Sequence, residues 1–338
     1  MDLAAETYDQ APAPVQAQFV EDWLDQAEPQ LTDPALRARV RTYLKGFTTK
    51  AMIRKMMAGI QARELGLDQP APLVVNPMPN LYFTRDPWAA IGNGVSINAM
   101  KYPVRKRELL FTTLIFTHHP RYKNTPRYFD FTADAGTIEG GDIFIYNSKT
   151  LVIGKSERTT LEAIVAIARN IQANRECSFE KIVAVNVPAL PNLMHLDTWL
   201  TMLDHNKFLY SPNMLSVLKF WELDLQQVPV QPVEQQGTLE TMLQKIIGQK
   251  PVLIPIAGPG ANALEINVET HFDGTNYLAL APGVVVGYHR NRRTEAALEA
   301  AGIKVLPFEG NQLSLGMGSA RCMSMPLIRD ELAAPAKG

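Results

Sequence analysis

Residues 142–185 read DIFIYNSKTLVIGKSERTTLEAIVAIARNIQANRECSFEKIVAV, and the fold follows from this stretch. Two short runs rich in apolar residues, 142–146 and 151–155, predict two strands joined by a turn. Apolar residues at helical spacing follow in 158–173, and another apolar run at 181–185 predicts a third strand. The order strand, strand, helix, strand (ββαβ) is the unit from which the rest of the chain can be interpreted.

The same order recurs at three other places along the chain. The proposed copies are 88–98 (two strands), 105–117 (helix) and 127–131 (strand); 197–203, 208–210, 239–247 and 252–256; and 277–280, 284–288, 293–301 and 304–307. Residues 312–327 follow the last copy, and we expect a terminal loop and strand there. Repeated supersecondary units predict a radial or stacked arrangement of small sheets.

The first 70 residues have a different pattern. Apolar residues recur at helical spacing in three segments, 15–27, 33–46 and 49–65, which predicts an all-helical region. After Pro70 the pattern changes to short β-rich runs broken by Gly, Pro and Asn. We therefore divide the chain into a helical subdomain (1–72), a ββαβ domain (73–330) and a disordered tail (331–338).

Composition limits the possible functions. Of the 338 residues, 46% are hydrophobic and 20% are charged, as in ordinary globular proteins with a substantial core. The 33 basic and 34 acidic residues give a formal net charge of -1, so no long-range field attracts nucleic acid or an anionic membrane. The sequence contains no signal peptide and no apolar run of membrane-spanning length. We expect a cytoplasmic protein that binds a small polar ligand.

The two cysteines, Cys177 and Cys322, are too few for a disulfide framework and are not spaced for zinc. Cys322 lies in LGMGSARCMSMP (315–326), a glycine-containing loop in which the neighbouring Arg321 would favour a thiolate. Such a loop can position a nucleophile, although a lone cysteine among methionines is more simply a small buried hydrophobe. Cys177 follows a helix and has no histidine or glycine motif around it, so we interpret it as structural.

The segment MHLDT (194–198) places His195 and Asp197 two residues apart. In a strand, such residues point to the same face, where they would form an acid/base pair within reach of one ligand. The alternative is a core histidine beside a turn aspartate.

Two further motifs contain acids at the start of predicted strands. In EGGD (139–142), two acids flank a diglycine that permits close approach of the backbone to a ligand; an ordinary turn is the alternative. The segment NLYFTRD (80–86) ends on an acid before a proline, and here the alternatives are a surface salt bridge between Arg85 and Asp86 or a turn aspartate.

Taken together, these motifs closely resemble those of arginine deiminases of the guanidine-modifying, or pentein, superfamily. The matching segments, in order, are FTRD (83–86), EGGD (139–142), HLDT (195–198) and RCMSMP (321–326). The resemblance extends from the N-terminal helices to about Asp330. It implies an α/β (α+β) fold, namely a pentein-type β/α propeller of ββαβ units with an N-terminal helical subdomain, four units complete here and the fifth incomplete.

The resemblance also implies the hydrolysis of L-arginine to L-citrulline and ammonia in arginine catabolism, without a cofactor or a metal. A guanidinium stays protonated at physiological pH, so acids must hold it. By this resemblance, Asp86 and Asp197 would bind the guanidinium nitrogens, and Glu139 would contact the guanidinium and orient His195. The Cys322 thiolate would attack the guanidinium carbon and form a thiouronium-type intermediate. His195 would protonate the departing ammonia and then activate water.

The family pattern assigns substrate binding to five residues: Asn80, Phe83, Arg105, Arg158 and Arg321. Arg105 and Arg158 would hold the α-carboxylate, although each could instead be a solvated helix-end charge. Asn80 and Phe83 would line the pocket, and Arg321 would assist both the carboxylate and the thiolate. Two carboxylate-binding arginines favour an amino-acid substrate over agmatine. The expected partner is therefore L-arginine, and we expect a homo-oligomer with no nucleic-acid or membrane partner.

Members of the family begin with a β-rich segment, whereas this sequence starts within the helices at Met1. The fifth unit is therefore expected to be incomplete, with exposed strand edges and impaired turnover despite a full set of catalytic residues. Three alternatives stay open: an N-terminally truncated, inactive remnant that acts by binding or assembly, a deiminase of another guanidine such as agmatine or a methylated arginine, and an amidinotransferase with the same cysteine chemistry.

Overall fold

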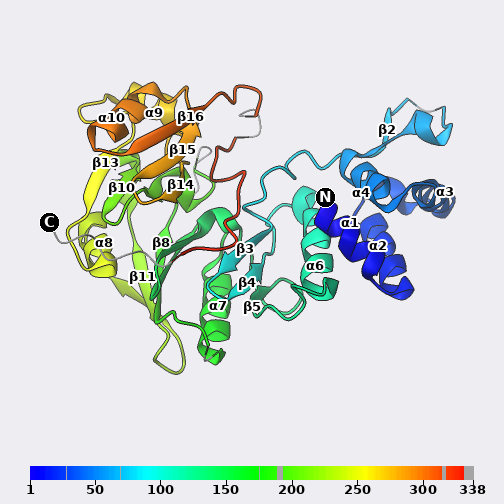
Figure 1. Ribbon diagram of the computed structural model, residues 1–338, viewed down its shortest axis with the longest axis horizontal. Helices are drawn as coiled ribbons and strands as arrows, with labels where there is room; N and C mark the ends of the chain where they lie inside the picture. Colours follow the sequence, from blue (N-terminus) through cyan, green and yellow to red (C-terminus); the bar gives the residue numbers. More distant parts are fainter. Residues whose placement is uncertain (28, 69, 175, 189–192, 314–316, 331–338) are drawn as a thin grey trace. The chain divides into compact units, whose positions relative to one another are not determined.

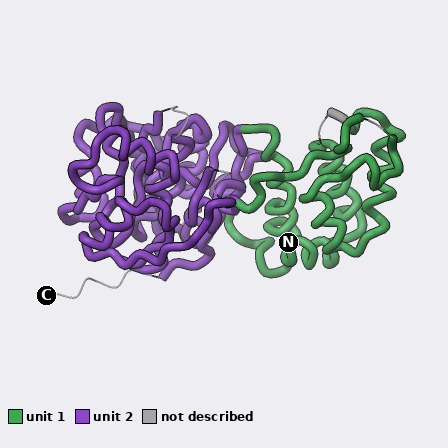
Figure 2. The backbone as a smooth tube through the Cα atoms, turned by 90° about the horizontal axis from the view of Figure 1, so that it is seen from above, with its two compact units in different colours: residues 1–82, 102–126 green, residues 83–101, 127–338 purple. Residues whose placement is uncertain are grey.

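The computed structural model describes residues 1–27, 29–68, 70–174, 176–188, 193–313 and 317–330 (Figure 1). The expected disordered tail, 331–338, lies outside the described residues, as do Leu315 and Gly316 of the cysteine loop. Contacts within the chain define two compact units, which Figure 2 colours separately: unit 1 (Met1–Tyr82 and Tyr102–Pro126) and unit 2 (Phe83–Lys101 and Arg127–Gly338).

Unit 1 is mainly helical. Its α-helices are α1 (Asp2–Gln10), α2 (Ala13–Gln26), α3 (Pro34–Lys45), α4 (Thr49–Ala58), α5 (Pro103–Lys106) and α6 (Glu108–His118). Trp23 and Leu44 are fully buried in its core, and Leu110, Phe111 and Leu114 of α6 pack into the same core. The contacts of α6 therefore place it in unit 1, whereas the expected boundary after residue 72 left this helix in the ββαβ domain.

The expectation of an all-helical N-terminal region is wrong at one point. The helix expected over 49–65 ends at Ala58, because Gly59 has φ +80° and a Cβ there would lie 2.5 Å from a backbone carbonyl oxygen. The chain then forms strand β1 (Ile60–Gln61), which pairs antiparallel with β2 (Leu73–Val75).

Within the described residues, unit 2 contains four sets of three strands that share one pattern. They are β3 (Trp88–Ile91), β4 (Gly94–Ile97) and β5 (Arg127–Asp130); β6 (Ile143–Asn147), β7 (Thr150–Lys155) and β8 (Lys181–Asn186); β9 (Leu200–Met202), β10 (Lys207–Tyr210) and β13 (Val252–Pro255); and β14 (Leu278–Ala281), β15 (Val284–Tyr288) and β16 (Lys304–Phe308). In each set, the first two strands pair antiparallel and the third pairs parallel with the second. The four predicted ββαβ units are confirmed.

Helices make the crossovers that parallel pairing requires. In unit 2 they are α7 (Leu161–Ala173), α8 (Leu239–Ile247) and α10 (Arg292–Ala300). Helix α7 buries Ile164, Ile167 and Ile171, spaced three and four residues apart, in one core with Tyr128 and Phe129 of β5. The hairpin β11 (Phe220–Asp224) and β12 (Pro232–Gln235) extends the second sheet to five strands.

Two strand predictions need correction. The strand expected over 197–203 is shorter, because a 3-10 turn occupies Leu196–Thr198 and β9 begins at Leu200. His195 and Asp197 therefore do not share a strand face. The terminal strand expected within 312–327 is not formed by the described residues of that range. Helix α9 (Ala263–His271), which precedes β14, was not predicted at all.

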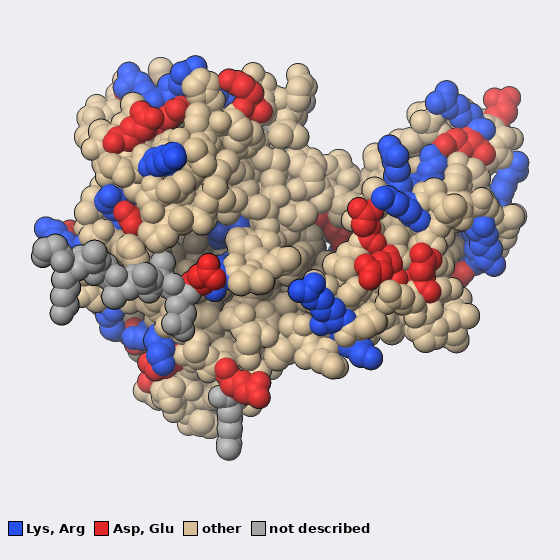
Figure 3. Space-filling view, viewed as in Figure 1, with Lys and Arg blue, Asp and Glu red and all other residues tan. Residues whose placement is uncertain are grey.

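Two global features bear on possible partners. No helix among the described residues is long and apolar enough to cross a membrane. On the face shown in Figure 3, basic and acidic side chains are interspersed, as the nearly balanced composition predicts.

Candidate active site

The five predicted catalytic residues lie in unit 2, at the junctions between its sheets and loops. Asp86 precedes β3, Glu139 precedes β6, and His195 and Asp197 precede β9, whereas Cys322 lies in the segment after β16. All five are buried, with exposed fractions of 6% or less. Carboxylates such as the three in this set are rarely buried unless they are paired with other groups or with a ligand.

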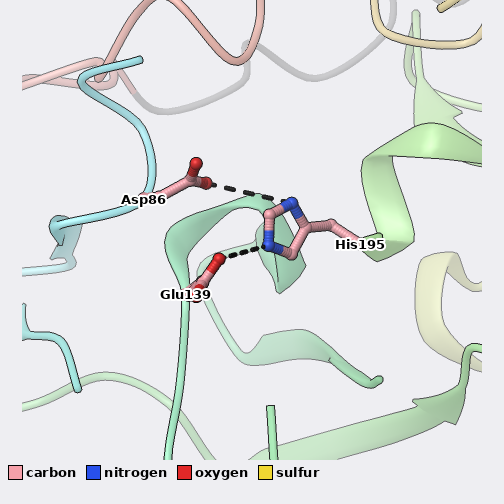
Figure 4. Close-up of side chains that lie close together, drawn as sticks. All are labelled: Asp86, Glu139 and His195. Atoms are coloured by element: carbon pink, nitrogen blue, oxygen red, sulfur yellow. Dashed lines mark hydrogen bonds and ion pairs between the residues drawn. The ribbon is translucent and has the colours of Figure 1, made fainter. Parts of the chain in front are cut away.

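His195 lies between two carboxylates (Figure 4). Its Nε2 is 2.9 Å from Glu139 Oε2, and its Nδ1 is 3.9 Å from Asp86 Oδ1. Burial lowers the pKa of His195, but the charge of Asp86 and the hydrogen bond with Glu139 outweigh burial and raise this pKa to about 10. The imidazole therefore carries a proton at neutral pH and is ready to donate it.

Gly141 allows the imidazole to approach the backbone closely. A Cβ at this position would lie 2.5 Å from His195 Nδ1, so any larger residue would displace the ring. The Gly141 N–H also donates to Asp86 Oδ1 at 3.2 Å. Gly141 of the EGGD motif thus leaves room for the His195 ring and helps to orient Asp86.

Asp142, the last residue of the EGGD motif, binds the backbone next to His195. It accepts hydrogen bonds from the Leu196 N–H (2.8 Å) and from the hydroxyls of Ser156 (2.7 Å) and Thr159 (2.5 Å). Because Leu196 follows His195, these bonds fix the backbone that carries the imidazole. Burial raises the pKa of Asp142 to about 6. The sequence singled out the motif, but no role was predicted for this residue.

Cys322 and Asp197 form the other side of the cluster. The Cys322 Sγ is 3.8 Å from Asp197 Oδ2, and Arg321 Nε is 3.3 Å from the same oxygen. Arg321 also donates to the Ile143 carbonyl at 2.9 Å and stacks on Phe144, with 3.6 Å from its Cζ to the ring centroid. Asp197 Oδ1 is buried and has no hydrogen-bond partner among the described residues.

The electrostatics of the site oppose a thiolate. Burial, followed by the charges of Asp197 and Asp86, raises the pKa of the Cys322 thiol well above its ordinary value. Arg321 lowers this pKa and therefore favours the thiolate as expected, but its charge does not outweigh burial and the two aspartates. A cation bound among these carboxylates would lower the pKa of the Cys322 thiol and favour the thiolate.

Three of the five predicted substrate-binding residues, Phe83, Arg158 and Arg321, lie in unit 2. Phe83 is buried, and a Cβ on Gly318 would lie 2.4 Å from its ring. Arg158 Nη1 is 3.0 Å from Glu139 Oε2, and its Nη2 donates to the Met194 sulfur at 3.3 Å. Glu139 therefore holds the Arg158 side chain in place.

The other two, Asn80 and Arg105, belong to unit 1. Arg105 forms two hydrogen bonds with Glu108, at 2.9 and 2.8 Å, and is 5% exposed. The alternative of a solvated helix-end charge is therefore excluded for Arg105. Burial likewise excludes a surface salt bridge for Arg85 and Asp86, which are 1% and 3% exposed.

Asp86, Glu139 and His195 also place ligand atoms within 4.8 Å of one another, so these residue types could hold a metal ion. The same atoms already have partners, because Glu139 accepts from the Lys101 N–H at 3.1 Å as well as from Arg158 and His195. The absence of a metal from the reaction stays a prediction.

Solved structures share this fold. The N-terminal domain of an ArgZ variant, described as covalently bound to a reaction intermediate, matches with a TM-score of 0.52 and 17% identity over 85% of this chain and 91% of that chain. Apo ArgZ, an arginine dihydrolase from cyanobacteria, matches with a TM-score of 0.52 and 16% identity over 76% of this chain and 33% of that chain. Together with the four ββαβ units, this likeness defines a pentein-type fold.

The chain belongs to the arginine deiminase family, whose model matches residues 1–329. A protein described as a putative arginine deiminase from Mycoplasma pneumoniae is 58% identical over 336 residues, which cover 98% of this chain and 83% of that protein. The arginine deiminase of Metamycoplasma arthritidis is 56% identical over 336 residues, covering 98% and 81% of the two chains. Membership of this family makes the protein a hydrolase of C–N bonds.

Proposed function

We propose that the chain hydrolyses L-arginine to L-citrulline and ammonia, with Cys322 as the nucleophile. The observation that carries the proposal is the buried thiol 3.8 Å from Asp197, whose other carboxylate oxygen has no partner among the described residues. Leaving such an acceptor buried and unpaired is unfavourable. A guanidinium supplies both the N–H donors and the positive charge that this carboxylate lacks.

Substrate binding would activate the thiol. The carboxylates that raise the thiol pKa in the unliganded site would be neutralised by the guanidinium, so that the Cys322 proton leaves to solvent. His195 keeps its proton because its 2.9 Å hydrogen bond with Glu139 still stabilises the imidazolium. The reactive state is then a thiolate beside an imidazolium.

The reaction proceeds in two halves. Cys322 sulfur attacks the guanidinium carbon and forms a C–S bond, while one C–N bond breaks and His195 donates its proton to the departing ammonia. The neutral imidazole then takes a proton from water, whose oxygen bonds to the same carbon. The C–S bond breaks to release citrulline and the thiolate; one water proton restores the imidazolium and the other leaves to solvent.

Other residues would position the substrate. In this proposal, Asp86 and Asp197 bind the guanidinium nitrogens, and Glu139 orients His195 across their 2.9 Å contact. Arg158, placed 3.0 Å from Glu139, would share its charge between that acid and the substrate α-carboxylate. The other expected contacts of the substrate are the carboxylate-binding Arg105 and Arg321 and the pocket-lining Asn80 and Phe83.

The same proposal includes a cytoplasmic location and a homo-oligomeric state. Both cysteines are free thiols, which fits a reducing compartment. Light scattering of the purified chain measures its mass in solution, and a monomeric mass would contradict the oligomer.

The proposed activity is tested by incubating the purified chain with L-arginine, agmatine, a methylated arginine, and L-arginine with an amine acceptor. Equal amounts of citrulline and ammonia from L-arginine are expected. Turnover of agmatine or a methylated arginine alone would indicate another guanidine deiminase, and transfer to the amine without ammonia would indicate an amidinotransferase. Arginine binding without any turnover would favour the inactive remnant.

A further inference from the structure

We infer that Asn276 is a positioning residue that ties the backbone of the nucleophile to the backbone of Asp197. The inference rests on the proposed function, because it explains how the proposed nucleophile is aligned. Asn276 lies between α9 and β14 and is 0% exposed. No motif in the sequence pointed to it.

The Asn276 side chain uses both its acceptor and its donor. Its Oδ1 accepts hydrogen bonds from the N–H groups of Cys322 (3.1 Å) and Ser319 (3.3 Å). Its Nδ2 donates to the carbonyl of Asp197 at 3.4 Å. One amide therefore bridges two segments that are 125 residues apart in the sequence and that carry the thiol and its neighbouring carboxylate.

None of the described residues after β16 joins a sheet, so the backbone groups around Cys322 depend on such partners. The Cys322 carbonyl accepts from the Arg85 N–H at 3.1 Å, and the Tyr288 hydroxyl donates to the Gly318 carbonyl at 2.9 Å. The Cys322 N–H depends on Asn276. Removing this amide would leave two buried N–H groups without their acceptor and would free the thiol to shift relative to Asp197.

Misplacing a reacting atom by about 1 Å can cost about 100-fold in rate. Replacing Asn276 with leucine, which has a similar volume but no hydrogen-bonding group, should therefore lower kcat by about 30- to 100-fold. The KM for arginine should stay within about threefold, because the carboxylates that would hold the guanidinium are untouched. Asn276→Asp keeps the acceptor and loses the donor, so its kcat should lie between those of the wild type and Asn276→Leu.

The matched control is Asn291, which is 1% exposed in the same unit and donates to the Phe272 carbonyl at 3.0 Å. Asn291→Leu should lose stability in a thermal melt and keep kcat within about threefold of the wild type. Steady-state kinetics and thermal melts of the wild type and the three variants make the comparison.

Three results would overturn the inference: a kcat within about threefold of the wild type for Asn276→Leu, a KM that rises in step with the loss of kcat/KM, or an equal loss of kcat in Asn291→Leu. If Asn276→Leu does not fold, Asn276→Asp decides, since an unchanged kcat overturns the inference and a lower kcat at unchanged KM supports it.

A wild type without turnover would overturn the proposed function instead. The inference is then tested by the rate at which iodoacetamide alkylates Cys322. This rate should change about tenfold in Asn276→Leu and not in Asn291→Leu. Equal rates in the wild type and Asn276→Leu would overturn the inference on its own.

Discussion

The two sides of the site differ in how their charges are satisfied. The histidine side comprises Asp86, Glu139, Asp142, Arg158 and His195, and the cysteine side comprises Asp197, Asn276, Arg321 and Cys322. On the histidine side, the imidazole already has a partner at 2.9 Å and its pKa is raised to about 10. On the cysteine side, the thiol pKa is raised and one buried carboxylate oxygen has no partner in the described chain. In the proposed mechanism, the histidine side therefore already carries the proton to be transferred, whereas the cysteine side requires the cation of the substrate.

Two aspartates show the difference most clearly. Asp142 and Asp197 are both 0% exposed, and burial raises the pKa of both. Asp142 receives three hydrogen bonds, whereas Asp197 has an ion pair with Arg321 at 3.3 Å and one oxygen for which the described residues provide no partner. The same residue type therefore positions a neighbour on one side and is available to a ligand on the other.

Removing the thiol should have the largest effect. Cys322→Ala should lower the rate of citrulline formation by about 10⁴-fold or more, because no other group on the cysteine side can form the covalent bond. Arginine affinity, measured by calorimetry, should stay within about tenfold. Cys177→Ala is the control, since Cys177 is partly buried against the core of the β6–β7–β8 sheet. Comparable losses in the two variants would contradict a specific role for Cys322.

Exchanging each aspartate for asparagine separates the two sides. Asp197→Asn should lower kcat/KM by about 10²- to 10³-fold and leave the unliganded protein as stable as the wild type or more stable, because a buried, incompletely paired charge is removed. Asp142→Asn should lose about 1–3 kcal/mol of stability, because its amide cannot accept all three hydrogen bonds, and should lose less activity. Enzyme kinetics and urea melts measure both quantities. A larger loss of stability in Asp197→Asn than in Asp142→Asn would contradict the proposed difference between the two sides.

The protonated histidine should make stability depend on pH. Since the folded-state pKa of His195 is about 10 against an ordinary value of 6.5, its stabilising contribution is complete below pH 6.5 and is lost as the pH rises toward 10. The difference in the free energy of unfolding between the wild type and His195→Gln should fall by a few kcal/mol, on the order of the shift, between pH 6 and 10. Parallel pH profiles from urea melts would show that the imidazole is neutral in the fold.

Gly141→Ala tests the close packing behind the imidazole. A methyl group 2.5 Å from Nδ1 would push the ring away from Asp86 and lower kcat by about 10- to 100-fold. Gly248→Ala is the control, because Gly248 has φ +73° and no atom near its added Cβ. It should cost about 1 kcal/mol of stability and leave kcat unchanged. Equal kcat in the two variants would argue against preorganisation of the histidine side.

The smallest expected effect is that of a chelator. Dialysis against EDTA should change citrulline formation by less than about twofold, because the atoms of Asp86, Glu139 and His195 that could bind a metal are engaged with one another. Loss of activity that zinc or manganese restores would assign the cluster to a metal.

Much of the fold could be predicted because each ββαβ unit produces a local pattern of apolar residues in the sequence. The strands of the unit at 142–185 and of its three copies pair as predicted, except that the strand expected over 197–203 is shorter and helix α6 of the first copy packs in unit 1. The packing of α6 in unit 1 could not be predicted from the apolar pattern. Buried residues occur all around this helix, so no single face identifies the elements that it contacts. Helix α9 was missed because Leu264 and Val268 are exposed, so its apolar residues do not follow a buried stripe.

The candidate site was predictable in its residue types and less so in its geometry. Strand alternation suggested that His195 and Asp197 point the same way, but the turn at Leu196–Thr198 directs the two residues to different partners. The raised thiol pKa depends on burial and on acids from distant segments, which a neighbouring arginine in the sequence does not reveal. Asn276 acts on Cys322 from 46 positions away, and no local pattern marks it.

The central claim is that the Cys322 sulfur bonds to the guanidinium carbon while the histidine side transfers protons. The most direct measurement is mass spectrometry of peptides from enzyme quenched in acid during turnover of L-arginine. We predict that the peptide carrying Cys322 gains the mass of arginine less ammonia and that the corresponding Cys322→Ala peptide gains none. Citrulline formation with no mass added to Cys322, or with the adduct on another residue, would contradict the claim.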